Sequence, residues 1–303
     1  MDLKRVLSIQ SHVVSGYVGN KAATFPLQVL GFDVDAINSV QLSNHTGYKS
    51  HKGQILNDSE LKNIFDGLKL NNLDRYSHLL TGYCRSESFL LEIASVLKHL
   101  KSINKELIYV CDPVMGDQGT FYVPQALLPI YKDILIPLAD IVTPNQFEAE
   151  QLSGVKILNE RDAFMAMRML HSIGPSIVII TSLCLENSSK LIIMGSTKGS
   201  PSEYVRFEIN KLDAFFHGTG DLFASLLLAW LYKFPENVKI ACEKTLSTIN
   251  MLLAKTIEHS ISPDSCKYEV PLSARMELRL VQNLTIILDP PEICKGELVQ
   301  VLD

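Results

Sequence analysis

The segment "HGTGDLFASLLLAW", residues 217–230, places an acidic side chain directly after two glycines and at the start of an apolar run. Gly218 and Gly220 permit close approach of a ligand to the backbone, and the amides of a helix N-terminus favour an anion. Asp221, in the first helical turn, would lie beside that anion. The pattern is typical either of an acidic residue that complements the helix dipole or of a place where a phosphoryl group is transferred.

Short β-rich runs that alternate with helical patterns must position this segment. Strands are predicted for residues 5–10, 32–40, 77–83, 107–113, 140–145 and 176–182, and a late antiparallel pair for residues 190–196 and 203–212. Four of these runs are almost continuously apolar, as expected of strands covered on both faces in a parallel sheet. They are residues 77–83, 107–113, 140–145 and 176–182.

Helices are predicted between these strands and after them. Ser86 and Asn159 are each suited to cap a helix with one apolar face. Three further helical stretches are predicted to begin near Gly220, Asn237 and Pro271. The alternation indicates an α/β fold with a central, mostly parallel sheet flanked by helices on both faces, and a single domain over residues 1–303.

Polar residues gather where the predicted strands end, and ligands of such sheets bind at the carboxyl ends of the strands. These residues are Ser11, Tyr83, Asp112, Thr143, Asn145, Thr181 and Ser182. One polar strand end is ordinary turn chemistry, whereas several at the same edge of one sheet predict a binding site.

Composition excludes several other functions. The net charge is -5 and no basic stripe appears, which argues against a nucleic-acid partner. The six cysteines show no CxxC pair or zinc-ligand spacing, which favours reduced thiols in a cytoplasmic protein. No segment approaches the ~18 apolar residues of a membrane span. Neither GxxxxGK[ST] nor a GxGxxG after a strand is present, so a P-loop enzyme or a nicotinamide dehydrogenase is disfavoured.

The GTGD segment at the start of an apolar helix resembles the anion hole and catalytic aspartate of the ribokinase-like small-molecule kinases. Within that superfamily, residues 8–48 resemble the N-terminal signature of the pyridoxal kinases. "LTGY", "VCDPVMGD", "ADIVTPNQFEAEQLSG", "VIITS" and "GTGDLF" then follow in that family's order. The resemblance extends from about Arg5 to about Gln282.

This resemblance implies transfer of the γ-phosphoryl group of ATP to the 5'-hydroxymethyl group of pyridoxal, pyridoxine or pyridoxamine. Asp221 is then expected to act as the general base toward the alcohol. The amides of Gly218, Thr219 and Gly220 are expected to stabilise charge on the transferring group.

The resemblance also implies a nucleotide side and a metal site. ATP is expected to contact Asp112, Asp117, Thr143, Asn145, Thr181, Ser182 and Thr219. Mg²⁺, as Mg-ATP, is expected at Asp112 and Glu148, and a monovalent cation, K⁺ or Na⁺, at Asp112, Thr143 and Thr181. From the letters alone, "TPN" at residues 143–145 favours a proline turn followed by a helix cap over a phosphate contact.

The vitamin side rests on five residues by the same resemblance. Ser11 and Thr46 are expected to bind the pyridine substituents, Tyr83 to pack near the ring, and Val40 and Leu42 to supply apolar contacts. His45, His12 and His217 are assigned no chemistry.

Three segments depart from the family pattern. The loop after Asp117 is shorter than in mammalian-type members, Leu42 replaces an aromatic residue of some relatives, and the tail from Asn283 onward matches poorly.

Two alternatives remain open at this point. A hydroxymethylpyrimidine kinase shares GTGD and the phosphate chemistry, although "NHTGY" and "TGY" favour pyridoxal. A non-catalytic vitamin-B6-binding protein is the second alternative, and it predicts erosion of Asp221 or of the flanking glycines, which are intact. Homodimerisation is expected from the resemblance alone.

Overall fold

The computed structural model describes residues 4–185, 189–200, 202–262 and 270–301. In this part of the chain, ten strands form one sheet in the order β12-β11-β10-β9-β8-β5-β4-β1-β2-β3. Their bounds are β1 Arg5–Val13, β2 Asp33–Leu42, β3 Gly53–Ile55, β4 His78–Thr81, β5 Ile108–Cys111, β8 Ile141–Val142, β9 Ile177–Leu183, β10 Lys190–Thr197, β11 Glu203–Asn210 and β12 Glu297–Gln300.

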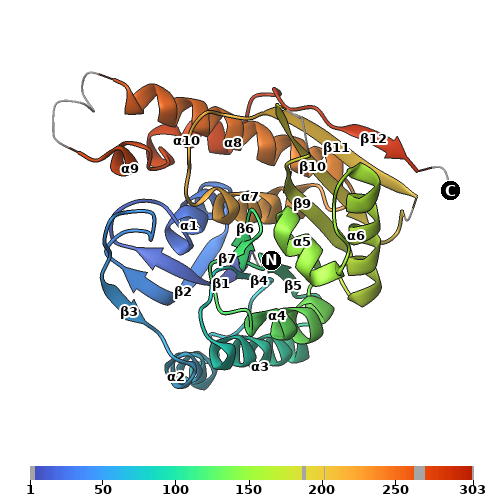
Figure 1. Ribbon diagram of the computed structural model, residues 1–303. Coiled ribbons are helices and arrows are strands. Elements are labelled where there is room, and N and C mark those ends of the chain that lie inside the picture. Colours follow the sequence, from blue (N-terminus) through green and yellow to red (C-terminus); the bar gives the residue numbers. More distant parts are fainter. Residues whose placement is uncertain (1–3, 186–188, 201, 263–269, 302–303) are drawn as a thin grey trace.

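A short hairpin and a set of helices complete the described chain (Figure 1). The hairpin consists of β6 (Gly116–Asp117) and β7 (Thr120–Phe121). The α-helices are α1 Asn20–Val29, α2 Asp58–Leu70, α3 Glu87–Ile103, α4 Leu127–Ile130, α5 Gln146–Ser153, α6 Glu160–Ile173, α7 Thr219–Lys233, α8 Val238–Ser260, α9 Leu272–Arg275 and α10 Leu284–Leu288. Shorter helical turns span Tyr131–Leu135, Ile136–Leu138 and Val281–Asn283.

The centre of the sheet is parallel, as the apolar runs predict. Strands β2, β1, β4, β5, β8 and β9 pair in parallel with their neighbours, whereas β3 at one edge and β10, β11 and β12 at the other pair antiparallel. The predicted late pair is confirmed, because β10 and β11 run antiparallel from the pair Lys190 and Asn210 to the pair Gly195 and Val205.

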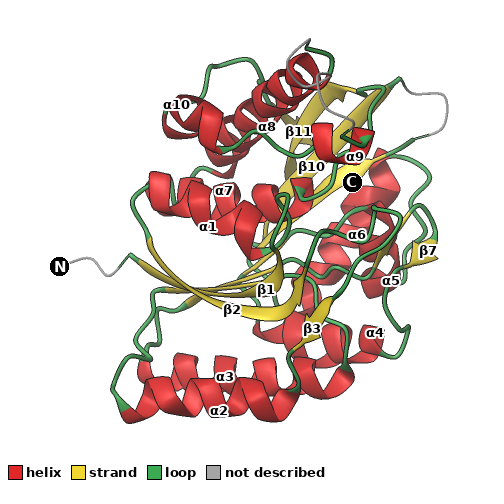
Figure 2. Ribbon diagram, turned by 90° about the vertical axis from the view of Figure 1, so that its left-hand side faces the viewer, coloured by secondary structure: helices red, strands yellow, loops and turns green. Residues whose placement is uncertain are grey.

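Helices cover both faces of this sheet, and each face has its own core (Figure 2). Successive strand residues point to opposite faces. In β4, Leu79 therefore packs in the core under α2, α3 and α6, and Leu80 in the core under α1, α7 and α8. Both side chains are fully buried. The predicted three-layer α/β fold is confirmed.

The predicted helix starts are confirmed, including the last, since α9 begins directly after Pro271. The Ser86 hydroxyl accepts from the Phe89 N–H at 3.2 Å, and Asn159 caps α6 in the same way. The stretch from Pro271 forms only a single turn, α9. The chain then leaves the helical path, and the Arg279 N–H donates to Thr256 Oγ1 of α8 at 3.3 Å instead of to a carbonyl of its own helix.

The tail from Asn283 contributes to the fold. Helix α10 contacts α1 and α8 through the buried Ile287, and β12 pairs with β11 at the edge of the sheet. Sequence patterning did not predict either element. Among the described residues, no helix is long and apolar enough to cross a membrane.

Candidate active site

The carboxyl ends of parallel strands meet at one edge of the sheet. Ser11 lies near the end of β1, Asp112 and Thr143 directly follow β5 and β8, and Thr181 lies near the end of β9. Because these strands run in one direction, their polar ends gather at the same edge. The structure therefore brings together residues that the sequence predicts to form a site.

Helix α7 carries the GTGD segment to this edge. Gly218 has φ 79°, and a β-carbon there would lie 2.0 Å from the Tyr17 carbonyl oxygen, so both backbone conformation and packing require glycine. A β-carbon on Gly220 would lie 3.6 Å from Asp112 Oδ2, which places the first turn of α7 against the end of β5. Residues 222–231 are all buried, so the helix is held on all sides.

The start of α7 is suited to bind an anion. Within the described chain, no side chain caps its N-terminus. The first amides of a helix have no acceptor inside the helix. Gly218 and Thr219 are partly exposed and Gly220 is exposed, so solvent and ligand can reach these amides.

Asp221 is fixed by a backbone contact from the other end of the chain. Its Oδ2 accepts from the Gly19 N–H at 2.7 Å. Desolvation raises the pKa of Asp221, and the Gly19 hydrogen bond offsets part of that rise. A raised pKa brings a carboxylate closer to the pH of the reaction, which suits a general base, and the role of Asp221 stays a prediction.

Two further carboxylates lie behind Asp221. Asp112 is buried, and desolvation together with the charges of Glu148 and Asp221 raises its pKa well above the usual range. Burial raises the pKa of Glu148 to about 7, against the opposing effect of backbone hydrogen bonds. The Thr143 hydroxyl donates to Asp112 Oδ1 at 3.3 Å. Two buried acids that disfavour each other's charge form a site that a cation would stabilise.

These donors fit magnesium. Hard oxygen ligands with retained waters are the ligation that Mg²⁺ prefers. Among the described residues, no group of three or more His, Cys, Asp or Glu side chains could hold a metal. Asp112 and Glu148 would therefore hold the ion together with phosphate oxygens and water.

Glu148 and Asn145 also organise the backbone. They form a capping box at the start of α5, in which Asn145 Oδ1 accepts from the Glu148 N–H at 2.9 Å and Glu148 Oε2 accepts from the Asn145 N–H at 3.0 Å. Glu148 Oε1 accepts from the Met115 N–H, and Asn145 Nδ2 donates to the Gly116 carbonyl. The alternative interpretation of "TPN" as a helix cap is thus correct for the fold, and the ATP contact of Asn145 stays a prediction.

Asp117 lies in the β6–β7 hairpin and not at the end of a long strand. Its Oδ1 accepts from the Gln118 N–H at 2.8 Å, and Gln118 and Gly119 turn the chain with φ 47° and 79°. Phe121 packs edge-on against Phe147 of α5, with ring centroids 4.9 Å apart. The short loop after Asp117 is therefore a tight turn anchored to the helix that carries Glu148.

The predicted vitamin residues lie at the neighbouring strands. Strand β1 pairs with both β2 and β4, which brings Val40, Leu42 and Tyr83 to the side of Ser11. The Ser39 hydroxyl donates to the Tyr83 carbonyl at 2.8 Å. Thr46 lies in the exposed turn after β2, and the predicted ATP residue Ser182 is partly exposed in β9. The roles of these residues stay predictions.

Sequence reasoning missed two residues that shape the site. Sequence reasoning assigns Gly19 no role of its own, although its N–H donates the hydrogen bond to Asp221. A glycine directly before a helix was the available signal. The second residue is Glu277, whose carboxylate accepts from the Tyr17 N–H. The sequence around Glu277 contains no signal that indicates this contact.

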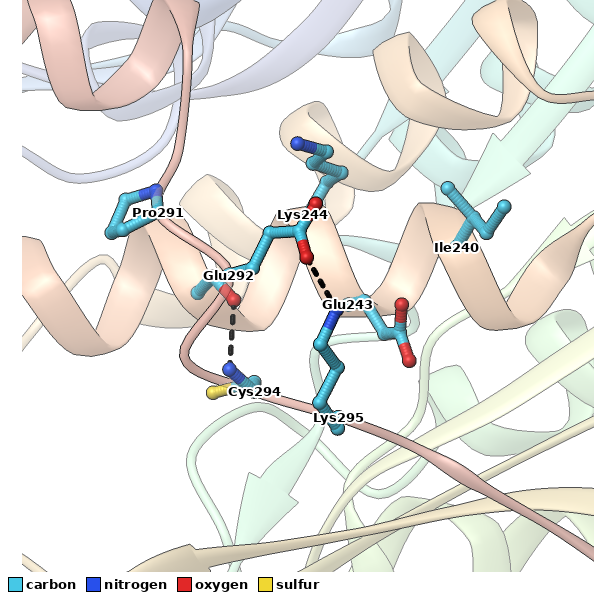
Figure 3. A pocket seen from close by; sticks show the side chains of 8 residues that line it. Ile240, Glu243, Lys244, Pro291, Glu292, Cys294 and Lys295 are labelled. Atoms are coloured by element: carbon cyan, nitrogen blue, oxygen red, sulfur yellow. Dashed lines mark hydrogen bonds and ion pairs between the residues drawn. The ribbon is translucent and has the colours of Figure 1, made fainter.

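A cavity of about 220 Å³ lies elsewhere, between α8 and the segment before β12 (Figure 3). Three of its four charged side chains form ion pairs: Glu243 with Lys239, which lies outside the lining, and Glu292 with Lys295. It shares no residue with the candidate site and carries no functional assignment.

Comparison with known proteins decides the family. A phosphomethylpyrimidine kinase family model matches residues 77–263, more than half of the chain. Pyridoxal kinase of Homo sapiens is 52% identical over 94% of this chain and 96% of its own length. The chain belongs to the pyridoxal kinase family. Pyridoxal kinase of Arabidopsis thaliana is 48% identical over 98% of this chain and 95% of its own length.

Solved structures agree with this family. Pyridoxal kinase from Leishmania donovani in complex with ADP and pyridoxine has a TM-score of 0.89 and 34% identity, covering 98% of this chain and 100% of that one. A phosphomethylpyrimidine kinase structure from Bacteroides thetaiotaomicron, at 23% identity and TM-score 0.86, shares the fold. The expected family and its ribokinase-like fold are confirmed.

Proposed function

We propose that the chain transfers the γ-phosphoryl group of ATP to the 5'-hydroxymethyl group of pyridoxal, and also of pyridoxine and pyridoxamine. One observation carries this proposal: Asp221, with a raised pKa, is held by the Gly19 N–H at the open start of α7, beside Asp112. An alcohol that reaches Asp221 would meet a phosphate bound at the amides of the same helix.

Asp221 takes the proton of the alcohol. Its Oδ2 already accepts a hydrogen bond from the Gly19 N–H. Oδ1 therefore accepts the hydroxyl proton as the new O–P bond forms. The bond from the γ-phosphorus to the bridging oxygen of ADP breaks in the same step, and that oxygen leaves with the electron pair. The products are the vitamin 5'-phosphate and ADP, and Asp221 later releases its proton to solvent.

The amides of Gly218, Thr219 and Gly220 stabilise the charge that spreads over the transferring group. They act without reorganisation, because residues 222–231 of α7 are buried and Gly218 is fixed against Tyr17. Preorganised donors of this kind supply much of the rate of phosphoryl transfer.

Asp112 and Glu148 hold Mg²⁺ in this proposal. The ion supplies neutralisation of the β- and γ-phosphate charge. Asp112, Thr143 and Thr181 also fit a monovalent cation, since all three offer oxygen ligands at neighbouring strand ends. The raised pKa values of Asp112 and Glu148 support a site that needs positive charge.

A competition between substrates tests the assignment against the sister activity. Purified protein with Mg-ATP and K⁺ is given pyridoxal and hydroxymethylpyrimidine, separately and together. We expect a higher kcat/KM for pyridoxal. A higher value for the pyrimidine would move the chain to the sister activity with the same phosphate chemistry. Binding of pyridoxal without turnover of either substrate would support the non-catalytic alternative.

A further inference from the structure

Glu277 lies outside the predicted site, yet its carboxylate joins two loops that border it. Oε2 accepts from the Tyr17 N–H at 2.8 Å. Oε1 accepts from the Tyr48 hydroxyl at 2.9 Å and lies 3.2 Å from His45 Nε2. Only 13% of the Glu277 side chain is exposed, so these three donors replace the water that the carboxylate loses on folding.

The first of these loops follows β1, and its last residue contacts Asp221, the proposed general base. Glu277 packs against Gly16, where a β-carbon would lie 2.2 Å from Oε1. Two residues after Tyr17, the Gly19 N–H donates to Asp221 Oδ2. The hydrogen bond from Tyr17 to Glu277 therefore anchors the loop whose end orients Asp221.

The second loop follows β2 and contains Thr46, a predicted vitamin ligand. On one side of it, His45 is held by Glu277, and His45 Nδ1 accepts from the Gly47 N–H at 3.1 Å. The His45 ring also packs against His217, with centroids 4.0 Å apart and the ring planes tilted by 32°. Both neighbours of Thr46 are thus fixed.

The charge of Glu277 suits this arrangement. Burial alone would raise its pKa, but hydrogen bonds from His45, Tyr17 and Tyr48 outweigh that effect and lower it. The carboxylate is therefore ionised at neutral pH and accepts from all three donors at once, in charge-assisted hydrogen bonds.

We propose that Glu277 is a positioning residue that holds loops 14–19 and 43–48 around the bound vitamin and so sets the affinity for pyridoxal and the orientation of Asp221. It touches neither substrate nor the reacting atoms. This inference rests on the proposed function. Most of the predicted ATP residues lie at β5, β8 and β9, with which Glu277 makes none of the contacts described above, so we expect ATP affinity to change less than pyridoxal affinity.

Glu243 provides a matched control. Its side chain is also 13% exposed, and its Oε1 accepts from the Gly296 N–H at 3.0 Å and pairs with Lys239 at 2.8 Å. It lies on α8 beside the C-terminal segment (Figure 3). Loss of either carboxylate removes a largely buried acceptor, but only Glu277 of the two borders the candidate site.

The test compares Glu277→Ala, Glu277→Gln and Glu243→Ala with the wild-type chain. We expect Glu277→Ala to raise KM for pyridoxal about tenfold or more and to lower kcat, while KM for ATP stays within about threefold. Glu277→Gln keeps one oxygen for Tyr17 but loses the second acceptor, so it should fall between Ala and wild type. Glu243→Ala should lower Tm and leave both KM values unchanged.

Three results would overturn the positioning role. The first is a KM for pyridoxal within about twofold of the wild-type value in a folded Glu277 variant. The second is an equal increase in the KM values for pyridoxal and ATP. The third is a Glu243→Ala variant with the same kinetic changes as Glu277→Ala. If Glu277→Ala does not fold, Glu277→Gln decides. Activity and binding measurements separate the two proposals. A wild-type chain without turnover contradicts the proposed function. Wild-type pyridoxal affinity in the Glu277 variants, measured by direct titration, contradicts the positioning role alone.

Discussion

The backbone N–H of Gly19 lies 2.7 Å from Asp221 Oδ2, although the two residues are 202 positions apart in the sequence. The contact joins the start of α1 to the first turn of α7. It occupies Oδ2, and Oδ1 is the oxygen that would accept a substrate proton in the proposed mechanism. The geometry of Asp221, the proposed general base, therefore depends on a loop that carries no acidic or basic group of its own.

Replacement of Gly19 tests this dependence. Gly19 has φ 54°, and a β-carbon there would lie 2.0 Å from the Ser11 carbonyl oxygen. We expect Gly19→Ala to lower the free energy of unfolding by about 1–3 kcal/mol and kcat by about tenfold or more, since the loop must shift away from Asp221. Thermal unfolding and steady-state kinetics measure the two effects.

Gly31→Ala is the control for backbone strain. Gly31 has φ 91°, but no atom lies within 4 Å of its β-carbon position. This variant should lose stability and keep the kcat of the wild type. An unchanged kcat in Gly19→Ala would contradict the role of the loop.

Gly220→Ala should separate activity from stability. The new methyl group would lie 3.6 Å from Asp112 Oδ2, an ordinary contact, and alanine favours a helix over glycine by about 0.5–1 kcal/mol. Tm should therefore be equal or higher, while kcat falls about tenfold or more because the methyl group occupies phosphate space. Gly218→Ala should instead lose stability, because its β-carbon would meet Tyr17. Full activity of a stable Gly220→Ala would argue against phosphate binding there.

The buried acids predict a pH dependence of stability. The pKa of Glu148 is raised from 4.5 to about 7, so the folded chain holds this proton more tightly than the unfolded chain. The resulting stabilisation is fully present below pH 4.5 and is lost as the pH rises through about 7. Mg²⁺ should offset the loss, and therefore raise Tm more at pH 8 than at pH 5.

Glu148→Gln is the control for that dependence. It removes the titrating group, so the fall in Tm between pH 5 and pH 8 and the extra effect of Mg²⁺ should both shrink. Calorimetry at several pH values, with and without Mg²⁺, measures this. The same slope in the variant and in the wild type would assign the pH dependence to other groups.

The sequence predicts the central sheet and the residues at its edge well. Apolar runs and helix caps depend on neighbouring residues, which is why β5, β9 and the Ser86 and Asn159 caps are recognisable. The GTGD motif is also a contiguous segment, and its function is inferred from its resemblance to a family of kinases.

Contacts between distant segments could not be predicted in this way. Glu277 and Tyr17 are 260 positions apart, and neither has a neighbourhood that indicates the other. After the single turn of α9, Arg279 likewise donates to Thr256 of α8, a tertiary contact that the local sequence pattern does not indicate. Hydrophobic periodicity contains no information on such tertiary contacts.

The most direct measurement is the rate of ATP-dependent pyridoxal 5'-phosphate formation by the wild-type chain and by Asp221→Asn, with Mg²⁺ and K⁺ present. Asparagine keeps an oxygen for the Gly19 N–H but cannot take a proton. The account predicts turnover by the wild type and a loss of about 10²–10⁴-fold in kcat in the variant, with ATP affinity unchanged. A variant that retains kcat within about tenfold of wild type would contradict the assignment of Asp221 as the general base.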